Sequence, residues 1–130
     1  MKLLNGLAAQ IIRDYIGATK TKVSVVAGSC RMNYECHSNA VHDAIEQKMG
    51  VAMLVGIYDS GSPFIHFVNV NRGKYIDNTL GAWSSRYDFY FIRIIDKQEL
   101  WEVHKIFDAY RKELRRMMPW YVRLLSDFKA

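Results

Sequence analysis

Three runs of strand-forming residues follow one another with only short turns between them. Apolar, aromatic and β-branched residues dominate 51–58, 64–70 and 74–79, and the last two runs are separated only by Asn71-Arg72-Gly73. Such residues pack well on a pleated sheet, and a connection this short fits a hairpin. The first gap, Asp59-Ser60-Gly61-Ser62-Pro63, is also typical of a turn. The sequence therefore predicts consecutive antiparallel strands, with 64–70 and 74–79 as a hairpin.

Segments with helical periodicity precede and follow these strands. Helices are predicted at 3–16, 35–49, 97–118 and 120–125, the third ending before Pro119. Gly17 and Gly50 are expected to end the first two helices. Two more strands are predicted at 22–27 and 87–95. Strands joined by short turns and flanked by helices indicate the α+β class, with N-terminal helices and a long C-terminal helix packed on the sheet.

Composition limits the class of protein further. The chain has 130 residues, half of them hydrophobic, which predicts a single domain covering 1–130. Neither a glycine-rich dinucleotide loop nor a phosphate-binding P-loop occurs in the sequence, which argues against nucleotide enzymes of those classes. Polar residues interrupt the first apolar segment, and no run approaches the roughly 20 apolar residues of a membrane span. We therefore expect a cytoplasmic protein without a membrane partner.

The positive charge is modest and lies late in the chain. The formal net charge is +5, and most of the late cations fall in or near the predicted helix 97–118. Acidic residues alternate with them there, and mixed charge along a helix usually marks a solvated face. Nucleic-acid binding would favour a less diluted basic stripe or a recognisable motif. The sequence therefore does not predict a nucleic-acid partner.

Cys36 is the first residue that points to chemistry. It stands at the predicted start of the helix 35–49, where unpaired N–H groups and the helix dipole favour a thiolate. A cysteine is also a common space-filling core residue, which is the alternative for Cys36 taken alone. In a reducing compartment Cys30 and Cys36 both remain thiols, with Cys30 structural. A disulfide between them is the alternative for an exported protein, and it would disable the nucleophile.

His66 and Asp77 give Cys36 a possible base and orienting carboxylate. With a two-residue turn at Arg72-Gly73, Val70 pairs with Tyr75, which puts Asp77 diagonal to His66 on the same face of the hairpin. A turn longer by one residue would direct Asp77 to the other face. Taken alone, His66 is typical of a satisfied core histidine, and Asp77 is equally typical of a turn. The three residues together favour a catalytic site.

These segments resemble the papain-like and transglutaminase-like superfamily of cysteine enzymes. The resemblance covers about 33–81 and lies in three short motifs: Glu35-Cys36-His37-Ser38-Asn39-Ala40, His66-Phe67-Val68, and Tyr75-Ile76-Asp77-Asn78-Thr79-Leu80-Gly81. The first looks like the Cys-x-x-Asn-Ala start of small bacterial and phage members. The order of cysteine on a helix, histidine on a strand and aspartate on the next strand is also that of the superfamily.

The resemblance implies a papain-like or transglutaminase-like core and a role for each residue. Cys36 would be the nucleophile, His66 the base and later the acid, and Asp77 the residue that orients the imidazole. The backbone N–H of Cys36 would form half of an oxyanion hole. The chain departs from the pattern at Cys30, where papain-type enzymes keep a glutamine. Asn33 is the nearest amide that could substitute for it, although Asn33 is equally typical of a turn.

One aromatic residue and two histidines complete the candidates. Trp83 follows the third motif and is predicted to wall the cleft and hold substrate, although aromatic residues near strand ends more often belong to a core. His37 and His42 lie near Cys36 without a recognised zinc spacing. We therefore expect neither a metal nor another cofactor.

Two functions remain at this stage. The first is a cysteine-dependent hydrolase or acyltransferase that acts on an amide or acyl bond of a protein or small molecule through a thioester. Peptidase, deamidase and transglutaminase-like reactions share this first step and are not distinguished. The second is a non-catalytic binding protein on the same scaffold, which uses the basic C-terminal helix to bind an acidic protein or nucleic acid.

Overall fold

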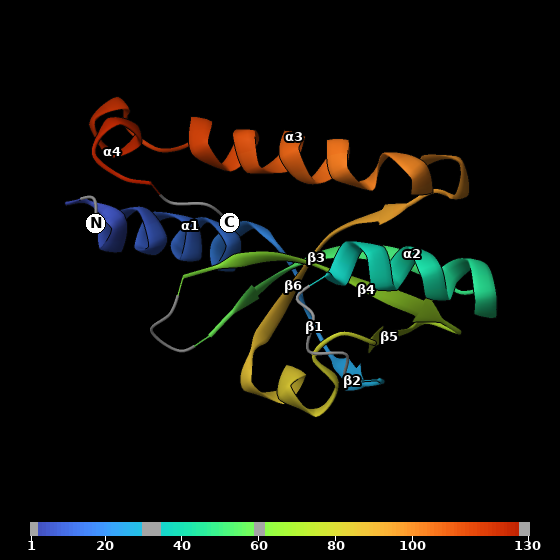
Figure 1. Cartoon of the computed structure of the whole chain (residues 1–130). Coiled ribbons are helices and arrows are strands. Elements are labelled where there is room, and N and C mark those ends of the chain that lie inside the picture. Colours follow the sequence, from blue (N-terminus) through green and yellow to red (C-terminus); the bar gives the residue numbers. More distant parts are fainter. Residues whose placement is uncertain (1–2, 30–34, 59–61, 128–130) are drawn as a thin grey trace.

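The chain folds into helices around a strongly curved β-sheet (Figure 1). The computed structural model describes residues 3–29, 35–58 and 62–127, and in them the sheet has six strands. The helices are α1 (Asn5–Thr19), α2 (Cys36–Gln47), α3 (Val103–Arg116) and α4 (Trp120–Leu124), with 3-10 helices η1 (Gly81–Arg86) and η2 (Lys97–Glu102). The strands are β1 (Lys22–Val23), β2 (Val25–Ala27), β3 (Gly50–Ile57), β4 (Phe64–Asn71), β5 (Lys74–Asp77) and β6 (Asp88–Ile95).

The prediction of one strand over 22–27 is wrong, because this segment divides at Ser24. The strand order is β1-β6-β3-β4-β5-β2, so its two halves occupy opposite edges of the sheet. Val23 and Val25 are two residues apart, and their Cα atoms can therefore lie no more than about 7 Å from each other. The sheet must curl until its edges meet. Local sequence patterns carry no sign of this curvature.

The sheet is antiparallel except at one edge. Among the described strands, four of the five pairings are antiparallel, and only β2 with β5 is parallel. The parallel pair results from the same division of 22–27, since β2 leaves β1 and continues along the far edge. The predicted combination of helices with a mainly antiparallel sheet is thus observed, with this one correction.

The hairpin of β4 and β5 has the predicted register. Val70 pairs with Tyr75 and Asn71 with Lys74, so the loop consists of Arg72 and Gly73 alone. Both loop residues have positive φ, 52° and 77°. These values are typical of the type I′ turn, whose twist matches that of a hairpin. The sequence argument for Asp77 required this loop length.

Hydrophobic residues pack on both faces of the sheet. On one face, Val51, Met53 and Val55 of β3 join a core with residues of the helices, among them Ile12, Ile16 and Leu114. On the other face, Ala52, Leu54, Val68 and Phe89 form a second cluster inside the curve of the sheet. Because both faces are covered, β3 is apolar along nearly its whole length and shows no alternation.

Several predicted helix ends differ from the observed ones. Helix α1 continues past Gly17 to Thr19. Helix α2 ends at Gln47 with Lys48 in the left-handed conformation, and Gly50 begins β3 instead of capping the helix. The predicted helix 97–118 begins as η2 and becomes α-helical at Val103. Residues 59–61 of the predicted first turn lie outside the described residues.

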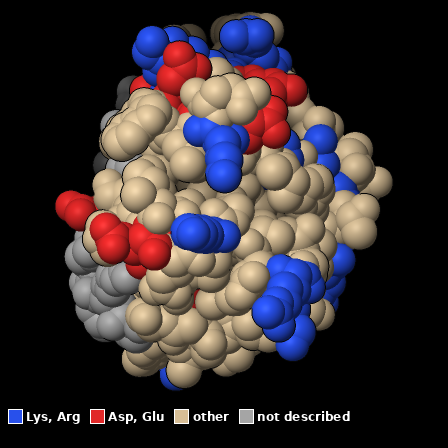
Figure 2. Space-filling model, turned by 90° about the vertical axis from the view of Figure 1, so that its right-hand side faces the viewer, with Lys and Arg blue, Asp and Glu red and all other residues tan. Residues whose placement is uncertain are grey.

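Charged side chains of both signs lie among uncharged ones on the side of the molecule where α2 ends. Figure 2 shows Lys and Arg interleaved with Asp and Glu over the upper part of this face, with a group of Lys and Arg at its lower right. The described residues include no helix that is long and apolar enough to cross a membrane.

Two glycines should respond oppositely to alanine. Gly73 has φ +77° and open space around it, so Gly73→Ala should lower the free energy of unfolding by about 1 kcal/mol through backbone strain alone. Gly17 lies inside α1 with open space where a Cβ would lie. Gly17→Ala should therefore raise the free energy of unfolding by about 1 kcal/mol. Urea unfolding of both variants measures this. Destabilisation by Gly17→Ala would contradict the observed continuation of α1.

Candidate active site

The three residues singled out as catalytic lie together. Cys36 is the first residue of α2, His66 lies in β4 and Asp77 ends β5. The His66 Nε2 is 2.7 Å from the Asp77 Oδ2, and the side chain of Cys36 hydrogen bonds to His66. Because Asp77 occupies Nε2, Nδ1 is the ring nitrogen left for the thiol. Cys36, His66 and Asp77 thus form a chain of hydrogen-bonded side chains.

Asp77 uses its two carboxylate oxygens for different purposes. Oδ1 accepts hydrogen bonds from the backbone N–H groups of Thr79 at 2.9 Å and Leu80 at 2.8 Å, while Oδ2 contacts His66. The first oxygen makes Asp77 the initiating residue of a turn, and the second makes it the partner of the imidazole. Asp77 therefore initiates a turn and also lies within hydrogen-bond distance of His66, and its role in catalysis stays a prediction.

Aromatic rings hold the His66 imidazole in place. It stacks on Phe89 with centroids 5.6 Å apart and meets Phe64 edge-on at 5.5 Å. Only 3% of the residue is exposed. A ring packed on one face and bonded at its nitrogens has few orientations available, so His66 is preorganised.

Gly56 makes room for these rings, and sequence reasoning missed it. It pairs with Phe64 on one side and Phe89 on the other. A Cβ at this position would lie 2.6 Å from Phe64 Cζ and 2.9 Å from Phe89 Cε1. A glycine inside an otherwise apolar strand often marks a close approach of neighbouring groups to its backbone. Gly56 gave this signal within the predicted strand 51–58.

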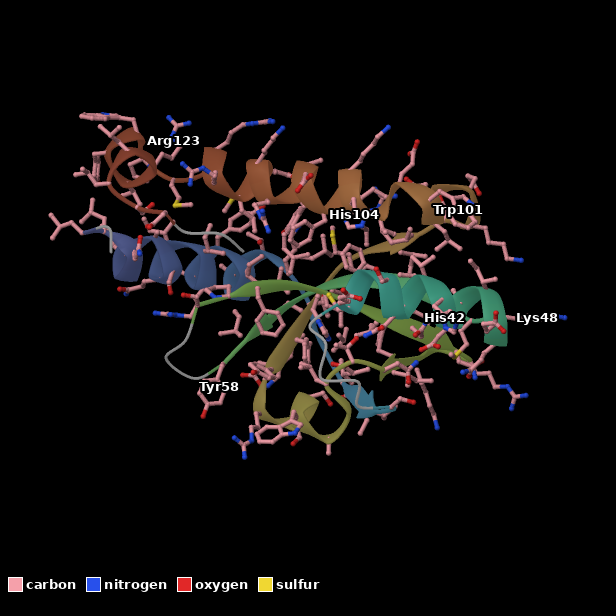
Figure 3. All side chains as sticks on the ribbon, viewed as in Figure 1. His42, Lys48, Tyr58, Trp101, His104 and Arg123 are labelled. Atoms are coloured by element: carbon pink, nitrogen blue, oxygen red, sulfur yellow. The ribbon has the colours of Figure 1, made fainter. Side chains whose placement is uncertain are left out.

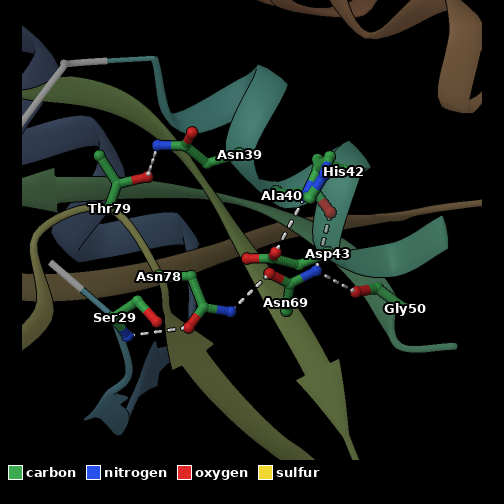
Figure 4. A network of polar contacts seen from close by, with 9 residues as sticks. All are labelled: Ser29, Asn39, Ala40, His42, Asp43, Gly50, Asn69, Asn78 and Thr79. Carbon is green, nitrogen blue, oxygen red and sulfur yellow. Dashed lines mark hydrogen bonds and ion pairs between the residues drawn. The ribbon is translucent and has the colours of Figure 1, made fainter. Parts of the chain in front are cut away.

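A network of buried amides fixes α2 relative to the hairpin (Figure 4). Asn69 donates to the carbonyl oxygens of Ala40 at 2.8 Å and Gly50 at 3.2 Å, and its own carbonyl accepts from Asn78 at 2.9 Å. Asn39 donates to the Thr79 hydroxyl at 2.9 Å. These bonds connect the helix that begins with Cys36 to the strands that carry His66 and Asp77. Sequence reasoning missed Asn69 and Asn78 as positioning residues.

The network extends to the segment after β2. The Ser29 N–H donates to Asn78 Oδ1 at 3.0 Å, and the Gly28 N–H donates to the Asp77 carbonyl at 2.9 Å. A Cβ on Gly28 would lie 2.1 Å from Asn78 Oδ1. Only glycine therefore lets this backbone approach the turn that follows Asp77.

Electrostatics favour a charged imidazole. Burial acts to lower the pKa of His66, but the hydrogen bonds to Asp77 and Cys36 outweigh it and raise this pKa to about 9. Burial acts to raise the pKa of Asp77, and the hydrogen bonds from His66, Leu80 and Thr79 lower it below its usual value. At neutral pH the pair is therefore an imidazolium and a carboxylate. A cation next to the sulfur favours thiolate over thiol.

A small pocket opens at the sulfur. Its volume is about 130 Å³. It is lined by Cys36, Phe64, Ile65, His66, Thr79 and Leu80. A cavity of about this size accommodates a group as large as benzene. Apart from Cys36 and His66, the side chains that line the pocket are apolar or uncharged, which suits a short neutral group.

Other predicted residues lie away from this pocket or outside the described part of the chain. Trp83 lies in η1, is 46% exposed, and has the Arg86 guanidinium 4.2 Å from its ring centroid. It is not among the described residues that line the pocket, and its role in substrate binding stays a prediction. Cys30 and Asn33 lie outside the described residues, as does the side chain of His37.

No metal site is evident within 3–29, 35–58 and 62–127, where no group of three or more His, Cys, Asp or Glu side chains is placed to hold an ion. The His42 Nδ1 lies 3.3 Å from Oδ1 of the buried Asp43 carboxylate, and Figure 4 shows both residues on α2.

Comparison with known proteins adds no family to this description. No protein-family model, curated protein or solved structure matches the chain.

Gly56→Ala should disturb the site through the two rings that clamp His66. The added methyl group requires Phe64 and Phe89 to shift, which should lower the free energy of unfolding by roughly 1–3 kcal/mol. The matched control is Gly50→Ala in the same strand, where a Cβ would make only ordinary contacts, the nearest at 3.5 Å. Urea unfolding measures the free energy of unfolding, and the NMR chemical shifts of the His66 ring report its environment. Equal behaviour of the two variants would contradict the clamp.

The ion pair should make stability depend on pH in a defined direction. The folded pKa of His66 lies above the usual 6.5, so its contribution is complete below pH 6.5 and is lost as the pH rises through about 9. At 1.36 kcal/mol per pH unit, the loss is at most about 3 kcal/mol. The contribution of Asp77 has the opposite dependence and is lost as acid protonates it. The pH dependence of unfolding should be reduced in His66→Gln but kept in His104→Gln, which changes an exposed histidine.

Proposed function

We propose that this protein is a cysteine-dependent hydrolase or acyltransferase that acts on an amide or related acyl bond through a thioester. The observation that carries the proposal is the placement of His66, with Asp77 on Nε2 and Cys36 hydrogen bonded to the same ring beside a pocket. We propose with it that the helix α2 and strands β3 to β5 correspond to a papain-like or transglutaminase-like core.

In the first half of the reaction the Cys36 thiolate attacks the carbonyl carbon of the substrate. A carbon–sulfur bond forms and the carbonyl electron pair moves to oxygen, near the backbone N–H groups at the start of α2. The carbon–nitrogen bond then breaks as the imidazolium Nδ1–H of His66 gives its proton to the departing amine. Asp77 keeps the other ring nitrogen protonated throughout, which fixes the tautomer.

In the second half a water molecule or an amine attacks the thioester. His66, now neutral, takes a proton from the attacking group while the new carbon–oxygen or carbon–nitrogen bond forms. The carbon–sulfur bond breaks, and the thiolate and imidazolium are restored. Water gives hydrolysis or deamidation, and an amine gives acyl transfer.

The pocket supports a limited choice of acyl group. A volume of about 130 Å³ with Phe64, Ile65 and Leu80 in the lining suits a short, uncharged group rather than an extended chain. We therefore propose a small substrate or an exposed side chain rather than general proteolysis.

Alkylation of Cys36 tests the nucleophile. Iodoacetamide should label Cys36 fast near pH 7, and His66→Ala should slow this labelling at least about tenfold because the stabilising cation is lost. Asp77→Asn, which keeps an acceptor oxygen for the turn, should slow it less. Mass spectrometry of each peptide gives the rates, with Cys30 as the internal comparison. Labelling of Cys36 no faster than Cys30, and independent of His66, would contradict the proposal.

Trapping of an acyl-enzyme tests the reaction itself. Incubation with p-nitrophenyl esters of short acyl chains should add the mass of the acyl group to Cys36, and hydroxylamine should remove it as the hydroxamate. Cys36→Ser and His66→Ala should not accumulate this adduct. Correct folding of each variant is checked by its circular dichroism spectrum.

The alternative is a non-catalytic binding protein on the same scaffold. One observation favours it: Lys112, Arg115, Arg116 and Arg123 gather at the end of α3. Binding by this cluster would survive Cys36→Ala, whereas acyl-enzyme formation would not.

A further inference from the structure

One end of the molecule has an exposed apolar patch formed by α4 and the start of α1. These elements and the residues next to them carry half of the exposed large hydrophobic side chains in the described residues: Leu3, Leu7, Trp120, Tyr121, Leu124 and Leu125. Three of them are mostly exposed, Leu3 at 85%, Trp120 at 68% and Leu124 at 64%. A hydrogen bond of 2.9 Å from the Leu4 N–H to the Leu125 carbonyl brings the two elements together, as Figure 1 also shows.

Cations border this α1–α4 patch. Lys112, Arg115, Arg116 and Arg123 line a hollow of about 210 Å³ where α3 ends and α4 follows. The Arg115 guanidinium donates to the Arg123 carbonyl at 3.1 Å, which links the two helices. No acidic residue occurs from 114 to 125, and Glu113 and Asp127 stand on either side of that stretch. The mixed charge predicted for the C-terminal helix therefore gives way to pure positive charge at its end.

Three kinds of partner fit this combination poorly. A second copy would bring its own Arg116 and Arg123 against these cations in a symmetric interface. A nucleic acid would neutralise the cations but leave Leu3 and Leu124 in water. A folded acidic protein would need a cavity for each protruding side chain. The hollow at this end is lined by cations, whereas the leucines and Trp120 project outward.

We propose that the α1–α4 patch binds the surface of an anionic phospholipid bilayer. Leucine and tryptophan side chains enter the boundary between headgroups and acyl chains, where Trp and Tyr are favoured. Arg and Lys at the border then contact lipid phosphates, and the hollow accepts a headgroup phosphate. The expectation of no membrane partner rested on the absence of a spanning segment, and a surface-bound protein needs none.

Vesicle sedimentation tests this proposal. The full chain should bind vesicles of phosphatidylcholine with about 30% phosphatidylserine, an anionic surface of the kind that attracts basic segments. It should bind pure phosphatidylcholine weakly, and the bound fraction should fall as salt rises. Trp120→Ser with Leu124→Ser should lower the partition coefficient by about tenfold or more. Lys112→Gln with Arg116→Gln and Arg123→Gln should lower it roughly 100-fold, and more on anionic than on neutral vesicles.

Matched controls come from the opposite end of the molecule. Trp101 is 81% exposed on η2, and Figure 3 places it and Lys48 far from Arg123. Trp101→Ser should leave binding unchanged. So should the triple change Lys48→Gln, Arg72→Gln and Lys74→Gln, which removes the same charge from other exposed sites. Cys36→Ala should also bind normally, so this test is separate from that of catalysis.

Several results would overturn the proposal. One is failure of the folded wild type to sediment with anionic vesicles at low salt. Another is a loss of vesicle binding in the control variants equal to that in the patch variants. Tighter binding to single-stranded oligonucleotide or to polyglutamate than to vesicles would assign the surface to a nucleic acid or an acidic protein. A dimer by light scattering that Trp120→Ser abolishes would assign it to a second copy.

Discussion

The buried carboxylate of Asp77 is the interaction on which the rest of the site depends. An isolated carboxylate inside a protein is strongly disfavoured, and here two backbone N–H groups and the imidazole of His66 compensate for its burial. The same three bonds shape the turn, orient the histidine and keep it charged. Because Asp77 both shapes the turn and keeps His66 charged, the fold of the hairpin is linked to the charge beside the Cys36 thiol.

The hairpin register and the start of α2, which point to Cys36, His66 and Asp77, could be predicted because local rules determine them. A type I′ turn at Arg72-Gly73 gives the register of β4 and β5, and that register puts Asp77 within reach of His66. The start of α2 at Cys36 also followed from residue pattern alone. These features depend on neighbours close in the chain, where turn chemistry and helix periodicity are informative.

The remaining features depend on contacts between distant segments. Ser24 looks like any strand residue, and only the closure of the whole sheet makes it a point of division. Asn69 resembles an ordinary polar strand residue, yet it connects α2 to the hairpin from a fully buried position. Gly56 carried a visible signal, but which rings it admits depends on two pairings across the sheet. Local patterns contain no information on such partners.

The division at Ser24 also affects how the protein behaves in a crowded solution. The outermost strands of the sheet, β1 and β2, have only two and three residues. A long open edge exposes a row of unpaired backbone N–H and C=O groups that can recruit a strand from another molecule. Here each outermost strand offers only a short row, and β1 and β2 are joined through Ser24 alone. The division that curls the sheet thus also limits the edge that β1 and β2 offer to a neighbouring molecule.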